Sequence, residues 1–508
     1  MPVPSKAAAY RALESHDSRF DGLLFVAVKS TGIYCRPVCP ARTPKLANCE
    51  FYSSAAAAQD AGYRPCLRCR PETAPQLAAW KGTSNTISRA MMLISEGALD
   101  AEESTVDGLA GRVGIGERQL RRLFLQHLGT SPLSVAQTRR VLFAKQLIHD
   151  TRLPMTEVAL ASGFNSLRRF NEVFQNLFHR PPTALRREAG KEHSAAEDEI
   201  ALQLSYQAPY DWDSMLAFFA ARAIPGIEIV ENNAYHRAIE LDGFIGTIRV
   251  DHLPRKHAIS AMIRFPAVRL LPRIVTRIRR MFDLEANIRV INQHLSRDSR
   301  LGGLLAARPG LRVPGGWDSF EVALRTVLGQ QVSLAVARQL AGRLTASHGK
   351  QLPDGSKTHQ ALTCAFPTAN DIATALSIDL GMPASRLRTL RVLAQAAASD
   401  PSLLAPSSAL EDSLDRLMTM PGVGDWTAQY IALRAMRDTN AFPAGDLGLL
   451  RGANNVFGHA VTPRELQKLS EAWAPWRAYA AQHLWAADGA SVPLQSRKDK
   501  HDALSQIR

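Results

Sequence analysis

Two close pairs of cysteines constrain the fold of the N-terminal part of this chain more than any other sequence feature. Three residues separate Cys35 from Cys39, two separate Cys66 from Cys69, and 26 lie between the pairs. Such spacing can fold both pairs onto one tetrahedral Zn²⁺ ion. Five of the six cysteines fall in this short region, which in a reducing compartment favours a metal site over disulfides. We therefore predict a zinc centre formed by these four cysteines, with Cys49 outside it.

Length and charge limit the number of domains and the kinds of partner that this chain can have. A chain of 508 residues is too long for one hydrophobic core and suggests roughly three or four domains. A net charge of +14 and a pI near 9.8 favour a polyanionic partner, nucleic acid ahead of membrane, although charge alone also fits an unrelated basic protein. The sequence has neither an uncharged apolar run of about 18 residues nor a signal-peptide core. We therefore predict a soluble, cytoplasmic protein without a membrane partner.

A predicted helical segment contains two helix-turn-helix patterns that repeat at an offset of 50 residues. In each pattern apolar residues recur every fourth position and would form the buried stripe of a helix. The two stripes are Leu120, Phe124 and Leu128, and Phe170, Phe174 and Phe178. The same helices carry residue types that contact DNA bases and phosphates: Arg118, Gln119, Arg121, Arg122, Ser166, Arg168 and Arg169. A solvated basic helix face is the alternative interpretation.

The second half of the chain changes from alternating to helical patterns. Apolar alternation after Leu202 predicts strands, and Trp212–Arg222 predicts a helix between the first two of them. In this α+β part we interpret Asp211, His236 and His252 as capping or surface groups. We expect six segments. They are a zinc segment (1–78), a helix-turn-helix segment (86–188), a linker (189–200), an α+β segment (201–310), a helical segment (311–490) and a tail (491–508).

A glycine-containing turn, Met420-Pro421-Gly422-Val423-Gly424, leads directly into an apolar helix. Glycines let backbone N–H groups point outward at a helix start, which creates a site for an anion such as a DNA phosphate. About twenty residues later, Asp446 is a lone acid in an apolar passage. A structural cap would account for the turn alone, whereas Trp426, Tyr430 and Asp446 together favour a nucleic-acid enzyme.

The cysteine pairs belong to a longer motif. It comprises Thr31-Gly32-Ile33-Tyr34-Cys35-Arg36-Pro37, Cys39, Ala41-Arg42, Phe51-Tyr52, Ala61-Gly62-Tyr63-Arg64-Pro65-Cys66 and Arg68-Cys69. This motif resembles the N-terminal domain of the bacterial Ada methyl-response proteins. The resemblance implies that Cys35 is both a zinc ligand and the nucleophile that takes a methyl group from a DNA phosphotriester. Methylation would change the net charge of a four-thiolate zinc site from −2 to −1 and lower its repulsion of DNA, as a one-way switch.

A second resemblance covers the helix-turn-helix segment. Gly163-Phe164-Asn165-Ser166, followed by the phenylalanine stripe and Pro182, resembles the DNA-binding domain of AraC-type regulators. His179 stands where that family usually has a glycine. The resemblance implies a sequence-specific transcription regulator that binds promoter DNA, and RNA polymerase is a candidate partner of such a regulator.

A third resemblance covers the second half. Leu328-Gly329-Gln330, the turn within Leu417–Ala428, Asp446 and Ala474-Pro475-Trp476-Arg477 resemble the helix-hairpin-helix DNA glycosylases, and among them the AlkA-type 3-methyladenine DNA glycosylases II. The resemblance implies that Asp446 stabilises positive charge on the deoxyribose during N-glycosidic cleavage. It also implies that Trp426, Tyr430 and Trp485 form an aromatic pocket for a flipped, positively charged base.

The same resemblance assigns the DNA contacts. Gly422 and Gly424 would hold a DNA phosphate, and a monovalent cation is a candidate cofactor at this hairpin. Gln331 stands where AlkA-type enzymes place an apolar wedge into the DNA. Bifunctional glycosylase/lyases carry a lysine two residues after the final hairpin glycine, where this chain has Trp426. We therefore predict a monofunctional glycosylase.

Two further absences narrow the implied chemistry. The iron–sulfur cluster of some relatives needs four C-terminal cysteines, and no cysteine follows Cys364. The Pro-Cys-His-Arg motif of a second methyltransferase domain does not occur. We therefore predict that the chain neither holds an iron–sulfur cluster nor repairs O6-methylguanine.

Together these patterns predict a multidomain protein: a small α+β zinc domain, an all-α double helix-turn-helix, an α+β subdomain and an all-α helix-hairpin-helix glycosylase domain. The expected function is DNA alkylation repair and response on double-stranded DNA. It combines excision of bases such as 3-methyladenine and 7-methylguanine, suicidal methyl transfer to Cys35, and transcription regulation. The alternative is a transcription regulator whose glycosylase-like half binds DNA without catalysis.

Overall fold

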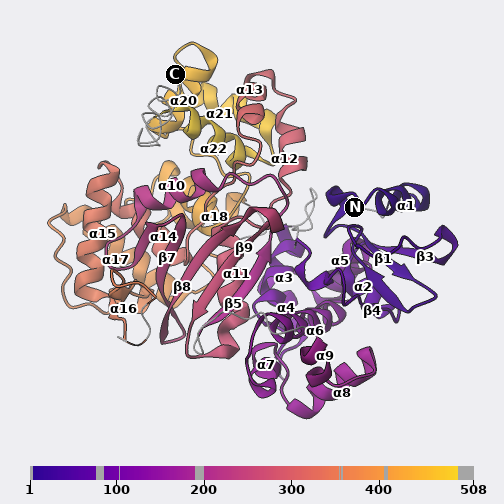
Figure 1. The fold of residues 1–508 in the computed structure, drawn as a ribbon. Helices are drawn as coiled ribbons and strands as arrows, with labels where there is room; N and C mark the ends of the chain where they lie inside the picture. The colour runs from indigo at the N-terminus through magenta and orange to yellow at the C-terminus, as the bar shows by residue number, and fades with distance from the viewer. Residues whose placement is uncertain are drawn as a thin grey trace, which may run out of the picture.

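Residues 4–75, 85–101, 103–188, 199–353, 355, 358–405 and 410–489 are described by the computed structural model of this chain. The predicted tail and most of the predicted linker lie outside these residues, and the linker's last position, Ile200, already begins strand β5. None of the described helices is both long and apolar enough to cross a lipid bilayer. Figure 1 shows a small N-terminal sheet, a group of helices, a larger central sheet and a helical body, which confirms the predicted multidomain fold class.

The N-terminal segment forms a four-stranded sheet in the order β3-β1-β2-β4. Strand β1 pairs antiparallel with β2 and β3, and the short β4 runs parallel to β2. Phe25 and Tyr34 pack edge to face in its small core. The elements are α1 (Lys6–Glu14), β1 (Phe25–Val28), β2 (Ile33–Cys35), β3 (Cys49–Tyr52), α2 (Ala55–Asp60), β4 (Arg64–Pro65) and the 3₁₀ turn η3 (Pro71–Thr73).

Seven helices follow and form the two predicted helix-turn-helix units. They are α3 (Asn85–Ser95), α4 (Val106–Val113), α5 (Glu117–Leu128), α6 (Pro132–Asp150), α7 (Met155–Ala161), α8 (Leu167–Phe178) and α9 (Pro182–Glu188). Both predicted apolar stripes, on α5 and α8, are buried. The two units therefore repeat in space as they do in sequence.

The ends of the two stripe-bearing helices share one backbone conformation. Helix α5 ends at Gly129, whose φ is 73°, and α8 ends at His179, whose φ is 55°. A side chain in this left-handed region costs about 1 kcal/mol relative to glycine. The chain thus keeps the C-terminal cap of α8 without the glycine that AraC-type regulators usually have there.

Helix α6 binds the zinc segment through a buried ion pair. Lys145 Nζ lies 2.5 Å from Glu72 Oε2 and also donates to the Cys66 carbonyl at 3.1 Å. The Lys145 side chain is fully buried and that of Glu72 is 1% exposed. Glu72 belongs to the 3₁₀ turn Pro71–Thr73, near the end of the predicted zinc segment. Pro71–Thr73 packs against α6 because a buried carboxylate requires a buried cation.

Helix α6 also contacts the larger sheet. Gln146, the residue after Lys145, donates from Nε2 to the Gln203 carbonyl on β5 at 3.0 Å. Apolar residues of α6 to α9 and of the sheet form one hydrophobic cluster, in which Phe174 and Leu204 are both buried. The helix-turn-helix segment and the second half of the chain are therefore packed together rather than joined only by a linker.

The larger sheet is antiparallel in the order β5-β9-β8-β7-β6. Its strands and flanking helices are β5 (Ile200–Ser205), α10 (Trp212–Arg222), β6 (Glu228–Glu231), β7 (Ala234–Leu241), β8 (Phe244–Leu253), β9 (Ala258–Arg264) and α11 (Leu271–Met281). Asp211 caps α10 by accepting from the Ser214 N–H at 3.0 Å, as predicted. His236, predicted as a capping or surface group, is instead buried on β7, because His359 packs against it with ring centroids 5.3 Å apart.

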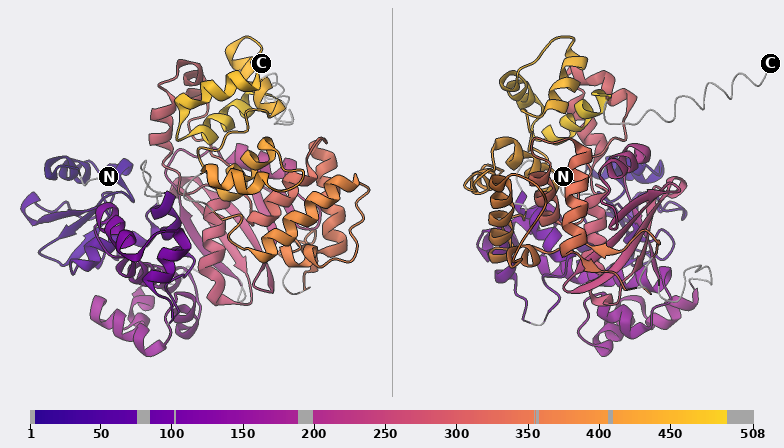
Figure 2. Two further views of the ribbon diagram at one scale, coloured as in Figure 1. Left: turned by 180° about the vertical axis from the view of Figure 1, so that it is seen from behind. Right: turned by 90° about the vertical axis from the view of Figure 1, so that its left-hand side faces the viewer.

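The remaining helices form one body with its own core. They are α12 (Ile288–Leu295), α13 (Ser299–Ala307), α14 (Ser319–Leu328), α15 (Leu334–His348), α16 (Ala369–Ala373), α17 (Ala384–Ser399), α18 (Leu410–Met418), α19 (Asp425–Ile431), the π-helical turn η7 (Ala432–Met436), α20 (Leu447–Phe457), α21 (Pro463–Ser470) and α22 (Arg477–Ala487). The sequence grouped α12 and α13 with the preceding strands. Their apolar residues instead enter the helical core, and Figures 1 and 2 show them beside the C-terminal helices.

The Lys145–Glu72 pair generates a stability prediction. Lys145→Met leaves a buried carboxylate with only Arg70 to compensate it and should lower the free energy of unfolding of this region by about 3 kcal/mol. Replacing both partners, Lys145→Met with Glu72→Leu, should recover most of the loss. Calorimetry and hydrogen exchange of the α6 amides measure the effect. Equal losses in the single and double variants would show that the pair is not what holds α6.

Candidate functional site

The predicted phosphate turn is a tight hairpin between α18 and α19. Gly422 has a φ of 81°, and a Cβ there would clash with Thr389 Oγ1, so only glycine fits. Gly424 is the N-terminal cap residue of α19, and a Cβ at this exposed position would meet open space. The first N–H groups of α19 have no intrahelical acceptor, so this uncovered helix start can accept an anion.

The turn between α14 and α15 is anchored to this hairpin. Gln330 Nε2 donates to the Gly422 carbonyl at 2.9 Å and to Thr427 Oγ1 at 3.0 Å. The next residue, Gln331, is exposed and has a φ of 56°. The structure therefore presents Gln331 at the tip of a turn whose position is fixed by its neighbour.

Asp446 lies at the edge of an aromatic cluster. Its Oδ2 accepts from Trp426 Nε1 at 2.9 Å, and its Oδ1 accepts from Trp485 Nε1 at 2.8 Å. Oδ1 also accepts from the Leu449 N–H at 2.9 Å, so Asp446 is the N-terminal cap of α20. A capping role requires only the Leu449 contact. The two indole donors additionally fix the carboxylate against the rings.

Three rings form this cluster. Trp426 and Tyr430, one turn apart on α19, are stacked with centroids 5.5 Å apart and planes 26° apart. Trp485 on α22 meets Tyr430 edge to face at 6.2 Å. All three side chains are half-buried. The structure thus brings the predicted pocket residues and Asp446 together from two helices and the start of a third.

Sequence reasoning missed two arginines beside this cluster. The guanidinium of Arg434 in η7 lies 4.9 Å from the Trp485 ring centroid and 4.7 Å from that of Phe218. Arg222 on α10 lies 3.9 Å from the Phe218 centroid. Burial alone would raise the pKa of Tyr430, but Arg222 and Arg434 hold it below its usual value. The one available signal was the spacing of Phe218 and Arg222, which are four residues apart on a predicted helix.

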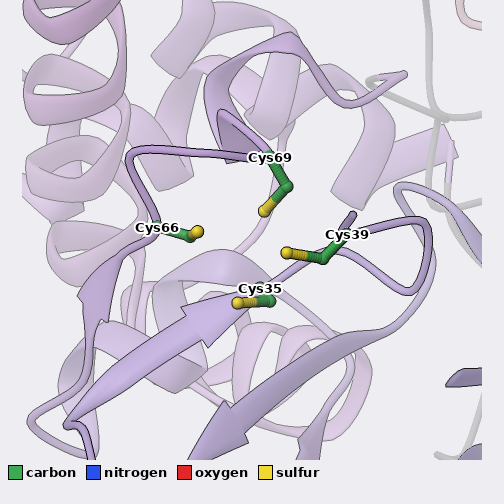
Figure 3. Close-up of side chains that lie close together, drawn as sticks. All are labelled: Cys35, Cys39, Cys66 and Cys69. Carbon is green, nitrogen blue, oxygen red and sulfur yellow. The ribbon is translucent and has the colours of Figure 1, made fainter. Parts of the chain in front are cut away.

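The four predicted metal ligands converge on one point. Their Sγ atoms all lie within 4.8 Å of one another, and Figure 3 shows them facing a common centre. Zinc–sulfur bonds of about 2.3 Å place the sulfurs of a tetrahedron roughly 3.8 Å apart, so this arrangement fits the ion. Cys49 is buried and lies outside the cluster, as predicted. The residues present therefore suit Zn²⁺ with four thiolate ligands.

The four thiols differ in exposure and hydrogen bonding. Cys39, Cys66 and Cys69 are buried, whereas Cys35 is half-buried. The Arg68 N–H donates to Cys66 Sγ and the Arg36 N–H donates to Cys69 Sγ, each at 3.4 Å. In the described part of the chain no N–H donates to Cys35 Sγ. Since a hydrogen bond withdraws charge from a thiolate, Cys35 escapes a withdrawal that Cys66 and Cys69 undergo.

The arginines near this centre fall into two groups. Arg36 pairs with Asp21, and Arg70 pairs with Glu72 at 3.0 Å and with Asp150 at 2.7 Å, so internal carboxylates hold both. Arg42 and Arg68 are exposed and can reach an external phosphate. Of these four arginines, only Arg42 and Arg68 are thus available to a phosphate outside the protein.

The predicted DNA-contacting residues are exposed on α5 and at the start of α8. This holds for Arg118, Gln119, Arg121, Arg122, Ser166, Arg168 and Arg169. Ser166 also caps α8 by accepting from the Arg169 N–H at 3.1 Å. A groove of about 710 Å³ runs along the start of α8 and is lined by Arg140, Asn165 and Arg168 among others. Both helices therefore expose basic side chains, of which Arg121 and Arg168 also pair with Glu117 and Glu172 on their own helices.

The sequence matches three family models. Residues 8–72 match the metal binding domain of Ada, residues 109–188 match a helix-turn-helix domain, and residues 201–318 match the AlkA N-terminal domain. The 3-methyladenine DNA-glycosylase structure from Archaeoglobus fulgidus superimposes with a TM-score of 0.50 at 20% identity. It covers 56% of this chain and 98% of that one, which shows a shared fold in the second half.

Two relatives extend the comparison. A Mycobacterium tuberculosis (strain CDC 1551 / Oshkosh) protein described as "Probable bifunctional transcriptional activator/DNA repair enzyme AlkA" is 39% identical over 479 residues, which are 94% of this chain and 95% of that protein. DNA-3-methyladenine glycosylase 2 of Escherichia coli (strain K12) is 33% identical over 291 residues. These are 56% of this chain and 97% of that enzyme.

The zinc centre, the paired helix-turn-helix units and the helix-hairpin-helix body define a DNA-binding regulator fused to a glycosylase fold. Similarity to a single relative runs through all of these parts. The chain belongs to the family of bifunctional AlkA transcriptional activator/DNA repair enzymes. The Ada, helix-turn-helix and AlkA resemblances, the zinc ion and DNA as a partner are thereby confirmed.

The metal centre generates a prediction about metal content. The purified protein should contain one zinc ion per chain by elemental analysis, because four thiolates complete one tetrahedral site. Cys66→Ser should reduce this content severalfold and destabilise the N-terminal segment. Cys49→Ser is the matched control, since Cys49 is equally buried but outside the cluster, and it should retain the metal. Loss of zinc in the control alone would refute the ligand assignment.

Proposed function

We propose that the second half of this chain is a monofunctional DNA glycosylase that releases alkylated bases of the 3-methyladenine and 7-methylguanine class. One observation carries the proposal: a carboxylate, Asp446, is held by two indole N–H donors at the edge of a three-ring cluster. The name of the Escherichia coli relative, DNA-3-methyladenine glycosylase 2, supports the same substrate class.

The ring cluster binds the damaged base, and the carboxylate stabilises the charge that forms on the sugar. The target nucleotide leaves the DNA stack, and its positively charged base lies against Trp426, Tyr430 and Trp485, whose ring faces attract a cation. The C1′–N bond then breaks, and its electron pair goes to the base, which leaves neutral. Asp446 faces the deoxyribose and stabilises the positive charge that develops there. A water molecule adds to C1′ and loses a proton, which leaves an abasic site.

The hairpin and the neighbouring turn position the DNA. Backbone N–H groups between Gly422 and the start of α19 bind a phosphate beside the lesion. A monovalent cation at the hairpin would strengthen this contact. Gln331 at its fixed turn fills the gap that the flipped nucleotide leaves. Trp426 occupies the place of the lysine that forms a Schiff base in lyases, so the enzyme does not cut the strand.

The N-terminal half senses alkylation at the DNA backbone. The Cys35 thiolate, which is the most exposed and accepts no N–H, attacks the methyl carbon of a phosphotriester. The new C–S bond forms as the C–O bond breaks, and the phosphodiester leaves with the electron pair. The zinc site then carries one negative charge less, and α5 and α8 bind promoter DNA more tightly. RNA polymerase is the proposed partner, and reduced thiolates support the cytoplasm as the compartment.

Asp446 provides the test of catalysis. Asp446→Asn should lower the release of 3-methyladenine from methylated DNA by about 10²–10³-fold, because the charge opposite the deoxyribose is lost. Chromatography of the released bases measures the rate. Asp211→Asn, which changes the N-terminal cap residue of α10 outside the site, is the matched control and should keep full activity. If wild-type protein binds alkylated DNA but releases no base, the second half is a binding module and the transcription-regulator alternative holds.

Cys35 provides the test of sensing. Incubation with DNA that carries methyl phosphotriesters should add the mass of one methyl group to the peptide containing Cys35, with zinc retained. Cys35→Ala should abolish the transfer, whereas Cys49→Ala should accept methyl like the wild type. Peptide mass spectrometry reports the modified residue. A methyl group on Cys39, or on none of the cysteines, would contradict the assignment.

A further inference from the structure

Arg434 is a buried charge without a counter-charge. Its side chain is 4% exposed, and its two hydrogen bonds go to neutral acceptors, the Pro314 carbonyl and Gln482 Oε1, each at 3.0 Å. No carboxylate of the described chain lies within ion-pair distance of it. Burial lowers the pKa of Arg434 to about 10, so the guanidinium still carries its charge at neutral pH. An uncompensated buried cation is costly, and its position calls for an explanation.

Elsewhere the chain compensates such a charge. Arg237, which is 1% exposed, pairs with Glu228 at 2.8 Å and with Glu321 on α14. Arg325 completes that network through the same two carboxylates. An arginine in this core can thus be neutralised, whereas Arg434, like Arg279 and Arg312, pairs with no carboxylate among the described residues. Unlike those two, Arg434 lies against the ring whose N–H holds Asp446.

Arg434 and Asp446 contact the same ring from different positions. The Arg434 guanidinium lies 4.9 Å from the centroid of Trp485, while the Trp485 Nε1–H donates to Asp446 at 2.8 Å. Tyr430 also interacts with both charges: burial raises its pKa, Arg222 and Arg434 lower it, and Asp446 raises it. Trp485 and Tyr430 therefore each interact with a fixed positive charge and with a fixed negative charge.

We propose that Arg434 is a positioning residue for N-glycosidic cleavage: its charge, with Asp446 at the ring edge, sets a field that drives positive charge from the bound base to the deoxyribose. The inference rests on the proposed glycosylase function. During cleavage of a cationic base, the base changes from positive to neutral and the deoxyribose from neutral to positive. A cation behind the base and an anion beside the sugar both favour that displacement.

The field affects binding and cleavage in opposite directions. The Arg434 charge repels a positively charged base in the bound ground state and repels it less in the transition state. For an assumed separation of about 7 Å and an effective dielectric of about 20, a unit charge changes the cleavage rate by at most roughly tenfold when half a charge leaves the base for the deoxyribose. Loss of the charge should therefore slow cleavage while it tightens binding. A residue that only supported the fold would weaken both.

The experiment measures binding and single-turnover cleavage separately on duplex DNA with one 7-methylguanine. Arg434→Met, which keeps the length of the side chain without its charge, should cleave up to about tenfold more slowly. It should bind this DNA more tightly by a larger factor, because the whole charge of the base is repelled in the bound ground state. Binding to duplex DNA with a tetrahydrofuran abasic analogue should not change, since that site has no base for Arg434 to repel. Arg434→Lys keeps the charge and should retain most of the cleavage rate.

A second variant decides the question if Arg434→Met fails to fold. Gln482→Glu places a carboxylate beside the Arg434 guanidinium and should produce the same slower cleavage and tighter binding. Gln482→Leu removes the same hydrogen bond without adding charge and should resemble the wild type. Wild-type cleavage rates in both Gln482→Glu and Arg434→Met, or equal losses in Arg434→Lys and Arg434→Met, would overturn the inference. Absence of base release by the wild type would instead refute the proposed glycosylase function.

Discussion

Helix α6 is held on one side by a buried ion pair and on the other by a shared core. Lys145 reaches Glu72 and the Cys66 carbonyl, and Gln146 reaches β5 of the larger sheet. Because these two residues are adjacent, the metal-binding loop and the glycosylase half contact one rigid helix. A displacement of the Cys66–Cys69 loop therefore acts on the helix that also contacts the sheet. The regulatory and repair halves share a physical connection that a flexible linker alone would not provide.

The second half depends on a comparable use of buried charge. Arg237, Glu228 and Glu321 join the larger sheet to α14, and α14 leads to the turn that carries Gln331. That turn is fastened to the hairpin by Gln330, and the hairpin leads into α19 with Trp426 and Tyr430. Asp446 is fixed in turn by the indole of Trp426. A continuous series of contacts, from the larger sheet through α14 and the hairpin, thus holds Trp426 and Asp446 in place.

Several features could be predicted because they depend on local pattern. Cysteine spacing identified the four ligands, the four-residue apolar period identified α5 and α8, and glycines identified the hairpin. The packed turn at Glu72 could not be predicted, since its partner Lys145 lies 73 residues away. The position of Arg434 beside the rings could not be predicted for the same reason, since Phe218 and Trp485, which it contacts, are far from it in sequence. The membership of α12 and α13 in the helical core also depends on contacts with helices far along the chain.

The sequence by itself determined the kinds of domain, the metal ligands and the residues that gather around Asp446. The metal ligands follow from local cysteine spacing, and the aromatic residues around Asp446 follow from the resemblance to AlkA-type glycosylases. Only the tertiary structure decided how these residues are held. It placed the indole donors on Asp446 and set Arg434 against Trp485, and among the described residues it gave Arg434 no carboxylate partner and Cys35 Sγ no N–H donor. Each of these depends on distances between side chains remote in sequence. A hydrogen bond or a Coulomb interaction is set by such distances, and a linear pattern does not contain them.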